Sequence, residues 1–300
     1  MTLPIAVADL TKAYGETRAV DGVSFQVEAG EFFGILGPNG AGKTTTLEII
    51  EGLRRPDSGE VRVFGASPWP RNADQLPRIG VQLQASSFFE RLTAREQIRT
   101  FASLYRIPDR RADEMLATVG LEAKANTRTE QLSGGEMQRL SIACSLVHGP
   151  ELVFLDEPTA ALDPQGRRNL WDLLREINGA GRTVVLTTHH LDEAEILCDR
   201  VAIMDHGKIL SAGPPATLVR GLDSATRISV ESGVLPVAEA RLLFQAAAVE
   251  DDGVSLTIAT DEPAPVLAAL ADRHALRGLS VRGATLEDVF LDLTGREYRA

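Results

Sequence analysis

The first ninety residues alternate apolar and polar positions in the way that β-strands do. Residues 23–27 and 60–64 follow the period of two that is typical of half-buried strands. Residues 5–10, 32–36 and 79–83 are short apolar runs, which predict further strands. This part of the chain is therefore predicted to be mainly β structure.

The spacing of apolar residues becomes typical of helices over residues 93–147. Thr93 begins this stretch, and Glu96 follows three residues later, which is the spacing of a capping box at a helix start. Toward its end, apolar residues recur at i, i+3, i+4 and i+7, namely Leu140, Ala143, Cys144 and Val147. We predict a helical subdomain over about 85–147.

Strands and helices alternate from residue 151 onward. Residues 152–155 and 183–187 are apolar runs that predict buried strands, and Asp163-Pro164 is a helix start with proline at the first helical position. Because helices separate the strands, a mostly parallel sheet is expected. The chain is predicted to be an α/β protein.

A boundary is predicted near residue 221, within a stretch rich in glycine and proline. The larger domain spans 1–221, and 222–300 forms a small α+β domain without a catalytic constellation. Its predicted strands and helices are 226–231, 254–259 and 279–282, and 236–247, 263–275 and 285–293.

Charge and composition exclude several classes of protein. The net charge of −11 argues against general nucleic-acid binding. The N-terminus lacks the pattern of a signal peptide, and no run of eighteen apolar residues predicts a membrane span. Cys144 and Cys198 lie in apolar helical patterns and are expected to be buried free thiols.

One motif indicates nucleotide binding. Residues 37–45 match G-x-x-x-x-G-K-[ST] between a predicted strand and a predicted helix, where an ordinary glycine-rich turn is the alternative. Backbone N–H groups of such a loop surround phosphates, Lys43 reaches the β- and γ-phosphates, and the Thr44 hydroxyl is a Mg²⁺ ligand. The expected binding residues are Gly37, Pro38, Asn39, Gly40, Ala41, Gly42, Lys43, Thr44 and Thr45.

Two acids end the apolar strand at 152–155. The carboxyl end of a parallel strand is where α/β sheets bind ligands. Asp156 is suited to hold Mg²⁺, and Glu157 can polarise an attacking water.

In addition to the phosphate loop, a second anion-binding site, or cradle, is predicted at the start of a helix. Ser133, Gly134 and Gly135 precede the apolar face that begins at Leu140. The alternative is a plain N-cap with a flexible turn. A single site needs only one cradle, so the second one needs an explanation.

Taken together, these motifs resemble the ATP-binding cassette (ABC) ATPases, the motor subunits of ABC transporters, over residues 5 to about 215. Residues 37–45 resemble Walker A, 152–157 Walker B, and 132–136 the signature motif with Glu136 in its last place. The family order also contains residues resembling the adenine-stacking aromatic, the Q-loop glutamine, the D-loop aspartate and the switch histidine, namely Tyr14, Gln84, Asp163 and His189.

The resemblance implies an ABC-type P-loop NTPase fold, with a parallel core sheet, an antiparallel β subdomain and a helical subdomain. It implies ATP hydrolysis with Mg²⁺, in which Glu157, His189, Gln84 and Lys43 are catalytic and Gln84 joins Thr44 and Asp156 at the metal. It also implies head-to-tail pairing with a second copy or a homologous ATPase subunit. Ser133 and Gly135 then reach the γ-phosphate of the opposite subunit, which explains two cradles in one chain.

Two roles have competing residues. Gln82 lies within its predicted strand and Gln84 after it, so Gln84 is preferred for the Q-loop. His189 directly follows its strand, whereas His190 is expected to begin the next helix as a surface residue.

The C-terminal segment indicates which kind of ABC transporter the chain serves. Residues 284–296 resemble the C-terminus of ATPase subunits from bacterial drug-resistance exporters of the type-2 class. The resemblance implies a separate membrane permease, docking over 85–96 near Phe88 and Phe89, a location on the cytoplasmic face of the cell membrane, and no nucleic-acid partner. An importer subunit, or a cassette ATPase acting on ribosomes or DNA, is the alternative, and the cargo is not encoded here.

Overall fold

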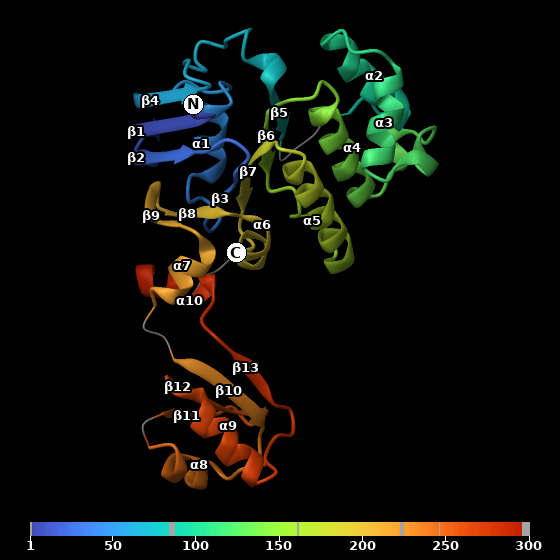
Figure 1. Cartoon of the computed structure of the whole chain (residues 1–300). Coiled ribbons are helices and arrows are strands. Elements are labelled where there is room, and N and C mark those ends of the chain that lie inside the picture. Colours follow the sequence, from blue (N-terminus) through green and yellow to red (C-terminus); the bar gives the residue numbers. More distant parts are fainter. Residues whose placement is uncertain (1, 84–87, 161, 223–224, 246, 296–300) are drawn as a thin grey trace. The chain divides into compact units, whose positions relative to one another are not determined.

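The computed structural model describes residues 2–83, 88–160, 162–222, 225–245 and 247–295 (Figure 1). The chain divides into two compact units, Met1–Pro215 and Ala216–Tyr298. This division lies six residues before the boundary expected from the sequence, and helix α7 (Pro215–Arg220) lies between the two positions.

The core of the first unit is a six-stranded sheet with the order β5-β6-β7-β3-β8-β9. All neighbours pair in parallel except β8 and β9, which form an antiparallel hairpin. The predicted α/β fold with a mostly parallel sheet is therefore confirmed. The strands are β3 (Phe32–Leu36), β5 (Ile79–Gln82), β6 (Leu152–Asp156), β7 (Thr183–Thr188), β8 (Arg200–Asp205) and β9 (Lys208–Gly213).

A three-stranded antiparallel sheet accompanies this core, with β1 (Ile5–Tyr14) between β2 (Thr17–Val27) and β4 (Ser58–Val63). Helix α1 (Lys43–Ile50) contacts strands of both sheets. Its buried residues join a single apolar cluster with both sheets, in which Phe25 and Phe33 stack with ring centroids 5.1 Å apart. Burial of this cluster fixes where α1 begins, and thereby the loop before it.

Three helices form a group beside β5, namely α2 (Ala94–Leu104), α3 (Arg110–Thr118) and α4 (Gly134–Leu146) (Figure 1). The predicted capping box at Thr93 is formed, because its side chain accepts from the Glu96 N–H and the Glu96 carboxylate accepts from the Thr93 N–H. Short 3₁₀ turns lie at Leu76–Arg78, Glu122–Lys124 and Thr129–Gln131.

Helices α5 (Pro164–Gly179) and α6 (Leu191–Leu197) pack on each other. Asp163 caps α5, accepting from the Gly166 N–H at 2.6 Å. Cys144 and Cys198 are buried and unpaired, as predicted, and burial raises the pKa of both thiols. None of the helices in the described ranges combines the length and apolarity that crossing a bilayer requires.

The second unit has the βαββαβ order of a ferredoxin-like module, followed by helix α10 (Leu286–Thr294). Its sheet is antiparallel throughout, with the order β11-β12-β10-β13. Strand β11 was missed in the sequence because it is a short strand with a single buried residue, Val249. The elements are β10 (Thr226–Glu231), α8 (Val237–Leu243), β11 (Ala248–Asp251), β12 (Ser255–Thr260), α9 (Pro263–Asp272) and β13 (Ser280–Arg282).

Candidate functional site

The phosphate loop joins β3 to α1 and requires glycine at two positions. A Cβ added to Gly42 would lie 2.1 Å from the Ala19 carbonyl oxygen, and one added to Gly37 would lie 2.1 Å from that of Met204. Gly42 also has a φ of +104°, which disfavours any L side chain. The neighbouring backbone therefore holds the loop in one conformation.

Lys43 begins α1 with its side chain only 4% exposed. Its ammonium group donates to the carbonyl oxygens of Gly37 at 2.8 Å and Pro38 at 3.2 Å. It also lies 3.2 Å from Oε1 of Glu157. These three acceptors match the three donors of an ammonium group, so the lysine is held at the loop.

Glu157 follows β6 with a φ of +46°. Its N–H donates to the carbonyl oxygen of Thr187 at 3.1 Å and to the Thr187 hydroxyl at 3.0 Å. A non-glycine residue with positive φ is uncommon outside constrained sites. Here it accompanies a carboxylate whose Oε1 faces Lys43 and whose Oε2 lies 3.1 Å from Nδ1 of His189.

Lys43, Glu157 and His189 therefore form a chain of contacts drawn from the ends of β3, β6 and β7. These strands are adjacent and parallel in the sheet, so their carboxyl ends share one edge. The structure brings together these three predicted catalytic residues.

Asp156 is buried and sits beside this chain. Its Oδ1 accepts a hydrogen bond from the Thr44 hydroxyl at 3.2 Å and another from the Thr187 hydroxyl. Burial raises the pKa of the Asp156 carboxyl, while these two hydroxyl donors act in the opposite direction. A carboxylate and a hydroxyl oxygen thus converge next to the phosphate loop.

Thr187 is a residue that the sequence analysis missed. Its hydroxyl donates to Asp156 and accepts from the Glu157 N–H, so one fully buried group orients both acids. The only signal in the sequence is a hydroxyl residue at the end of an otherwise apolar run.

Ser133, Gly134 and Gly135 lie elsewhere, at the start of α4. The Ser133 side chain accepts from the Glu136 N–H at 3.3 Å, and Glu136 accepts from the Ser133 N–H at 2.9 Å. That backbone donor, together with Lys124, lowers the pKa of Glu136. Among the described residues, α4 packs on α2, α3 and β5, whereas α1 packs on β2, β4, β6 and β7, so the two cradles belong to different groups of elements.

The structure describes only some of the residues expected to stack on adenine or to form the Q-loop. Tyr14 ends β1 and is 42% exposed, with Arg54 5.3 Å and Lys12 5.8 Å from its ring centroid. Gln84 lies outside the described residues. Gln82 is the buried last residue of β5, and its amide donates to the Leu83 carbonyl oxygen.

His190 begins α6 as expected, but it is not a surface residue. Its side chain is half-buried, and its ring centroid lies 4.2 Å from that of His189. Burial lowers the pKa of His190, which favours the neutral imidazole. The helix start was predicted correctly and the exposure was wrong, because the folded chain covers part of the His190 ring and buries its Nε2.

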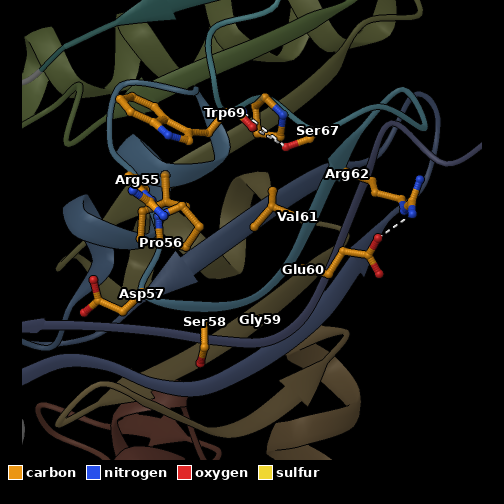
Figure 2. A pocket seen from close by; sticks show the side chains of 12 residues that line it. Arg55, Pro56, Asp57, Ser58, Gly59, Glu60, Val61, Arg62, Ser67 and Trp69 are labelled. Carbon is orange, nitrogen blue, oxygen red and sulfur yellow. Dashed lines mark hydrogen bonds and ion pairs between the residues drawn. The ribbon is translucent and has the colours of Figure 1, made fainter.

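Trp69 lines a hollow that is separate from these residues (Figure 2). The hollow has a volume of about 380 Å³. Ile49 near the C-terminal end of α1, strand β4 and the loop that contains Trp69 line it. None of the predicted nucleotide-binding or catalytic residues line it. We assign it no role.

Comparison with known proteins places the chain in a family. A model described as ABC transporter matches residues 20–160, and one for the C-terminal domain of the nodulation factor export protein NodI matches 237–295. The Nod factor export ATP-binding protein I of Ralstonia nicotianae is 39% identical over 305 residues, covering 98% of this chain and 95% of that protein. The protein of that name from Sinorhizobium fredii is 38% identical, covering 98% and 87%.

The chain belongs to the ATP-binding subunits of ABC transporters. Solved ABC ATPases agree with this assignment. CbiO1 of Clostridium perfringens has a TM-score of 0.68 at 29% identity, covering 74% of this chain and 92% of its own. The ATP-binding cassette MJ0796, solved as a dimer bound to ADP and Pi, has a TM-score of 0.64 at 32% identity, covering 70% and 98%.

The predicted family, fold class and enzyme class are therefore confirmed. As an ABC ATPase, the chain binds and hydrolyses ATP. The contacts around Lys43, Asp156 and Glu157 lie at the carboxyl ends of parallel strands, where α/β sheets bind ligands.

Proposed function

We propose that this chain is the ATP-driven motor of a bacterial exporter, acting as a pair of ATPase subunits on a separate membrane permease. The relatives that match nearly its whole length are named for export, and the match includes their C-terminal region. This favours an exporter over an importer. Membership of the drug-resistance class stays a prediction.

The contact chain from Lys43 through Glu157 to His189 carries the mechanistic part of the proposal. Glu157 is the general base that takes a proton from the attacking water, and His189 orients its second oxygen. Phosphate oxygens compete with Glu157 for the Lys43 ammonium group. Binding of the triphosphate therefore releases the Glu157 carboxylate toward the water.

The Thr44 hydroxyl and the Asp156 carboxylate fit Mg²⁺, which proteins bind through one or two carboxylates together with substrate phosphates and water. No cluster of three or more acids, histidines or cysteines is found among the described residues, which agrees with this sparse ligand set. Gln84 is the third proposed ligand. When bound, Mg²⁺ neutralises charge that develops on the phosphates.

We infer that the second cradle acts across the pair. Ser133 and Gly134 are exposed at the start of a helix of thirteen residues, away from the phosphate loop of their own subunit. Asp163 caps α5 and would lie near the partner subunit in the same arrangement. Tyr14, half-exposed beside Arg54, is the proposed platform for adenine.

The proposed location is the cytoplasmic face of the membrane, where the permease docks at Phe88 and Phe89. Phe89 is 63% exposed, and a large apolar side chain in contact with water fits a docking residue.

The deciding experiment compares Glu157→Gln with Glu151→Gln. We expect Glu157→Gln to bind ATP, to lose about 10²- to 10⁴-fold in phosphate release, and to accumulate as an ATP-bound dimer in sedimentation. Glu151 lies just before β6, at its opposite end, and pairs with Arg78 at 2.7 Å, so its variant should hydrolyse ATP normally. Normal turnover by Glu157→Gln would remove Glu157 as the base.

A further inference from the structure

The sheet of the second unit has one face that its two main helices do not cover. Ile228, Val230, Leu256 and Ile258 point to the core shared with α8 and α9. Because side chains alternate along a strand, the residues between them point to the opposite face. That face carries hydroxyl and guanidinium groups.

A row of hydroxyl groups crosses three strands of this face. Ser229 on β10 lies directly opposite Thr257 on β12 and Ser280 on β13. The Ser229 and Thr257 hydroxyl oxygens are 3.0 Å apart and share a hydrogen bond. Hydroxyl groups both donate and accept, so the row suits a ligand that carries hydroxyl groups of its own.

Two arginines lie next to this row, directly opposite each other. Arg227 on β10 and Arg282 on β13 are cross-strand partners in the antiparallel ladder. Like charges in this position destabilise a sheet. Arg227 contacts Asp288 at 3.1 Å, and Arg282 forms no ion pair within the described part of the chain.

This repulsion is unusual in so acidic a segment. Residues 222–300 contain 13 acids and 7 arginines, so most charged positions are negative and two arginines are nevertheless opposed. A bound anion would convert the repulsion into a pair of charge-assisted hydrogen bonds.

The same residues line a hollow. It has a volume of about 690 Å³, and α10 bounds it with Thr285, Asp288 and Leu291. Sites for small molecules measure roughly 300–1,000 Å³. The Asp288 carboxylate accepts a hydrogen bond from the Thr285 N–H at the start of α10 and pairs with Arg227. Glu287, which also lines the hollow, is exposed to solvent.

We propose that this face binds a phosphorylated polyol. The phosphate lies between Arg227 and Arg282, since its oxygens offer enough acceptors for both guanidinium groups. The hydroxyl groups of the ligand lie along Ser280, Ser229 and Thr257. The same chemistry is present in a free solute and in a phosphoglycerol lipid headgroup.

The test uses glycerol 3-phosphate, titrated calorimetrically into the full chain with its phosphate loop saturated by ADP. We expect saturable binding that Arg282→Gln weakens about tenfold or more, because it removes a charge-assisted hydrogen bond. Arg241→Gln removes the same charge from α8, on the opposite side of the sheet, and should leave the affinity unchanged. Without ligand, Arg282→Gln should melt no lower than the wild type, because it relieves the repulsion.

A second arm uses vesicles of phosphatidylglycerol. Binding to vesicles alone, lost in Arg282→Gln and kept in Arg241→Gln, assigns the site to the lipid headgroup, and binding of the free probe assigns it to a solute. The proposal is overturned if neither probe binds at up to about 10 mM. Equal affinity of the wild type and Arg282→Gln in both arms would also overturn it.

Discussion

Glu51 should destabilise the first unit increasingly as the pH rises. It caps the C-terminus of α1 with 3% of its surface exposed, and neither carboxylate oxygen has a hydrogen-bond partner among the described residues. Burial raises its pKa well above the usual value, and the negative charges of Asp156 and Glu48 act in the same direction. A neutral glutamine at this position avoids the ionisation.

The sign follows from proton binding. The folded chain keeps the Glu51 proton at pH values where the unfolded chain has released it, so the stability falls as the pH rises from the unfolded pKa toward the folded one. The slope is at most about 1.4 kcal/mol per pH unit for one proton. Glu51→Gln has no such slope, so its unfolding free energy should equal that of the wild type near pH 4.5. Above this pH, the variant should become more stable than the wild type by up to about 1.4 kcal/mol per pH unit, until the pKa of Glu51 in the folded chain is reached.

Unfolding in urea, followed by tryptophan fluorescence, measures this directly. The chain has two tryptophans, Trp69 and Trp171, and both lie in the first unit, so the signal reports that unit alone. Glu48→Gln is the control on the same helix. Glu48 pairs with Arg54 at 2.6 Å, so its variant loses that ion pair. Its charge is the smallest of the three causes that raise the Glu51 pKa, so any gain with rising pH should be much smaller than in Glu51→Gln.

A constant difference in unfolding free energy between Glu51→Gln and the wild type from about pH 5 to pH 8 would refute this assignment to Glu51. A constant difference would mean that Glu51 ionises alike in both states. An equally large growing difference in Glu48→Gln would assign the effect to the helix as a whole.

Three further predictions concern the site. Thr187→Val keeps the side-chain volume and removes the hydroxyl that orients both acids, so urea unfolding should show a loss of about 1–3 kcal/mol and phosphate release should fall. Lys43→Ala should weaken ATP binding about tenfold or more in a fluorescent-nucleotide titration, because it removes charge-assisted hydrogen bonds to phosphate. Phe88→Ala with Phe89→Ala should lower transport by the assembled transporter and leave the ATPase activity of the isolated chain intact, whereas equal loss of both would argue against docking there.

Local features of the site were readable from the sequence. The phosphate loop, the acids after residues 152–155 and the caps at Thr93 and Asp163 each depend on neighbouring residues, so a short pattern specifies them. The element types in the second unit were predicted for the same reason, apart from α7 and β11.

Features set by tertiary contacts were not readable. Thr187 looks like one more β-branched strand residue until β6 and β7 pair. His190 becomes half-buried only when the chain folds and buries its Nε2. The opposition of Arg227 and Arg282 depends on the register of two strands that are far apart in the chain.

Strand order explains which of the predicted site residues meet within one chain. Strands β6, β7 and β3 are consecutive in the sheet, so Glu157, His189 and Lys43 meet although other elements separate them in sequence. Ser133 follows no strand of this sheet; it begins a helix that packs on α2, α3 and β5. Its position is therefore not fixed by the sheet edge that positions the other three. In the proposed pairing a second subunit would supply the α4 cradle without any change in that edge, and closure of the site would then depend on pairing of the subunits.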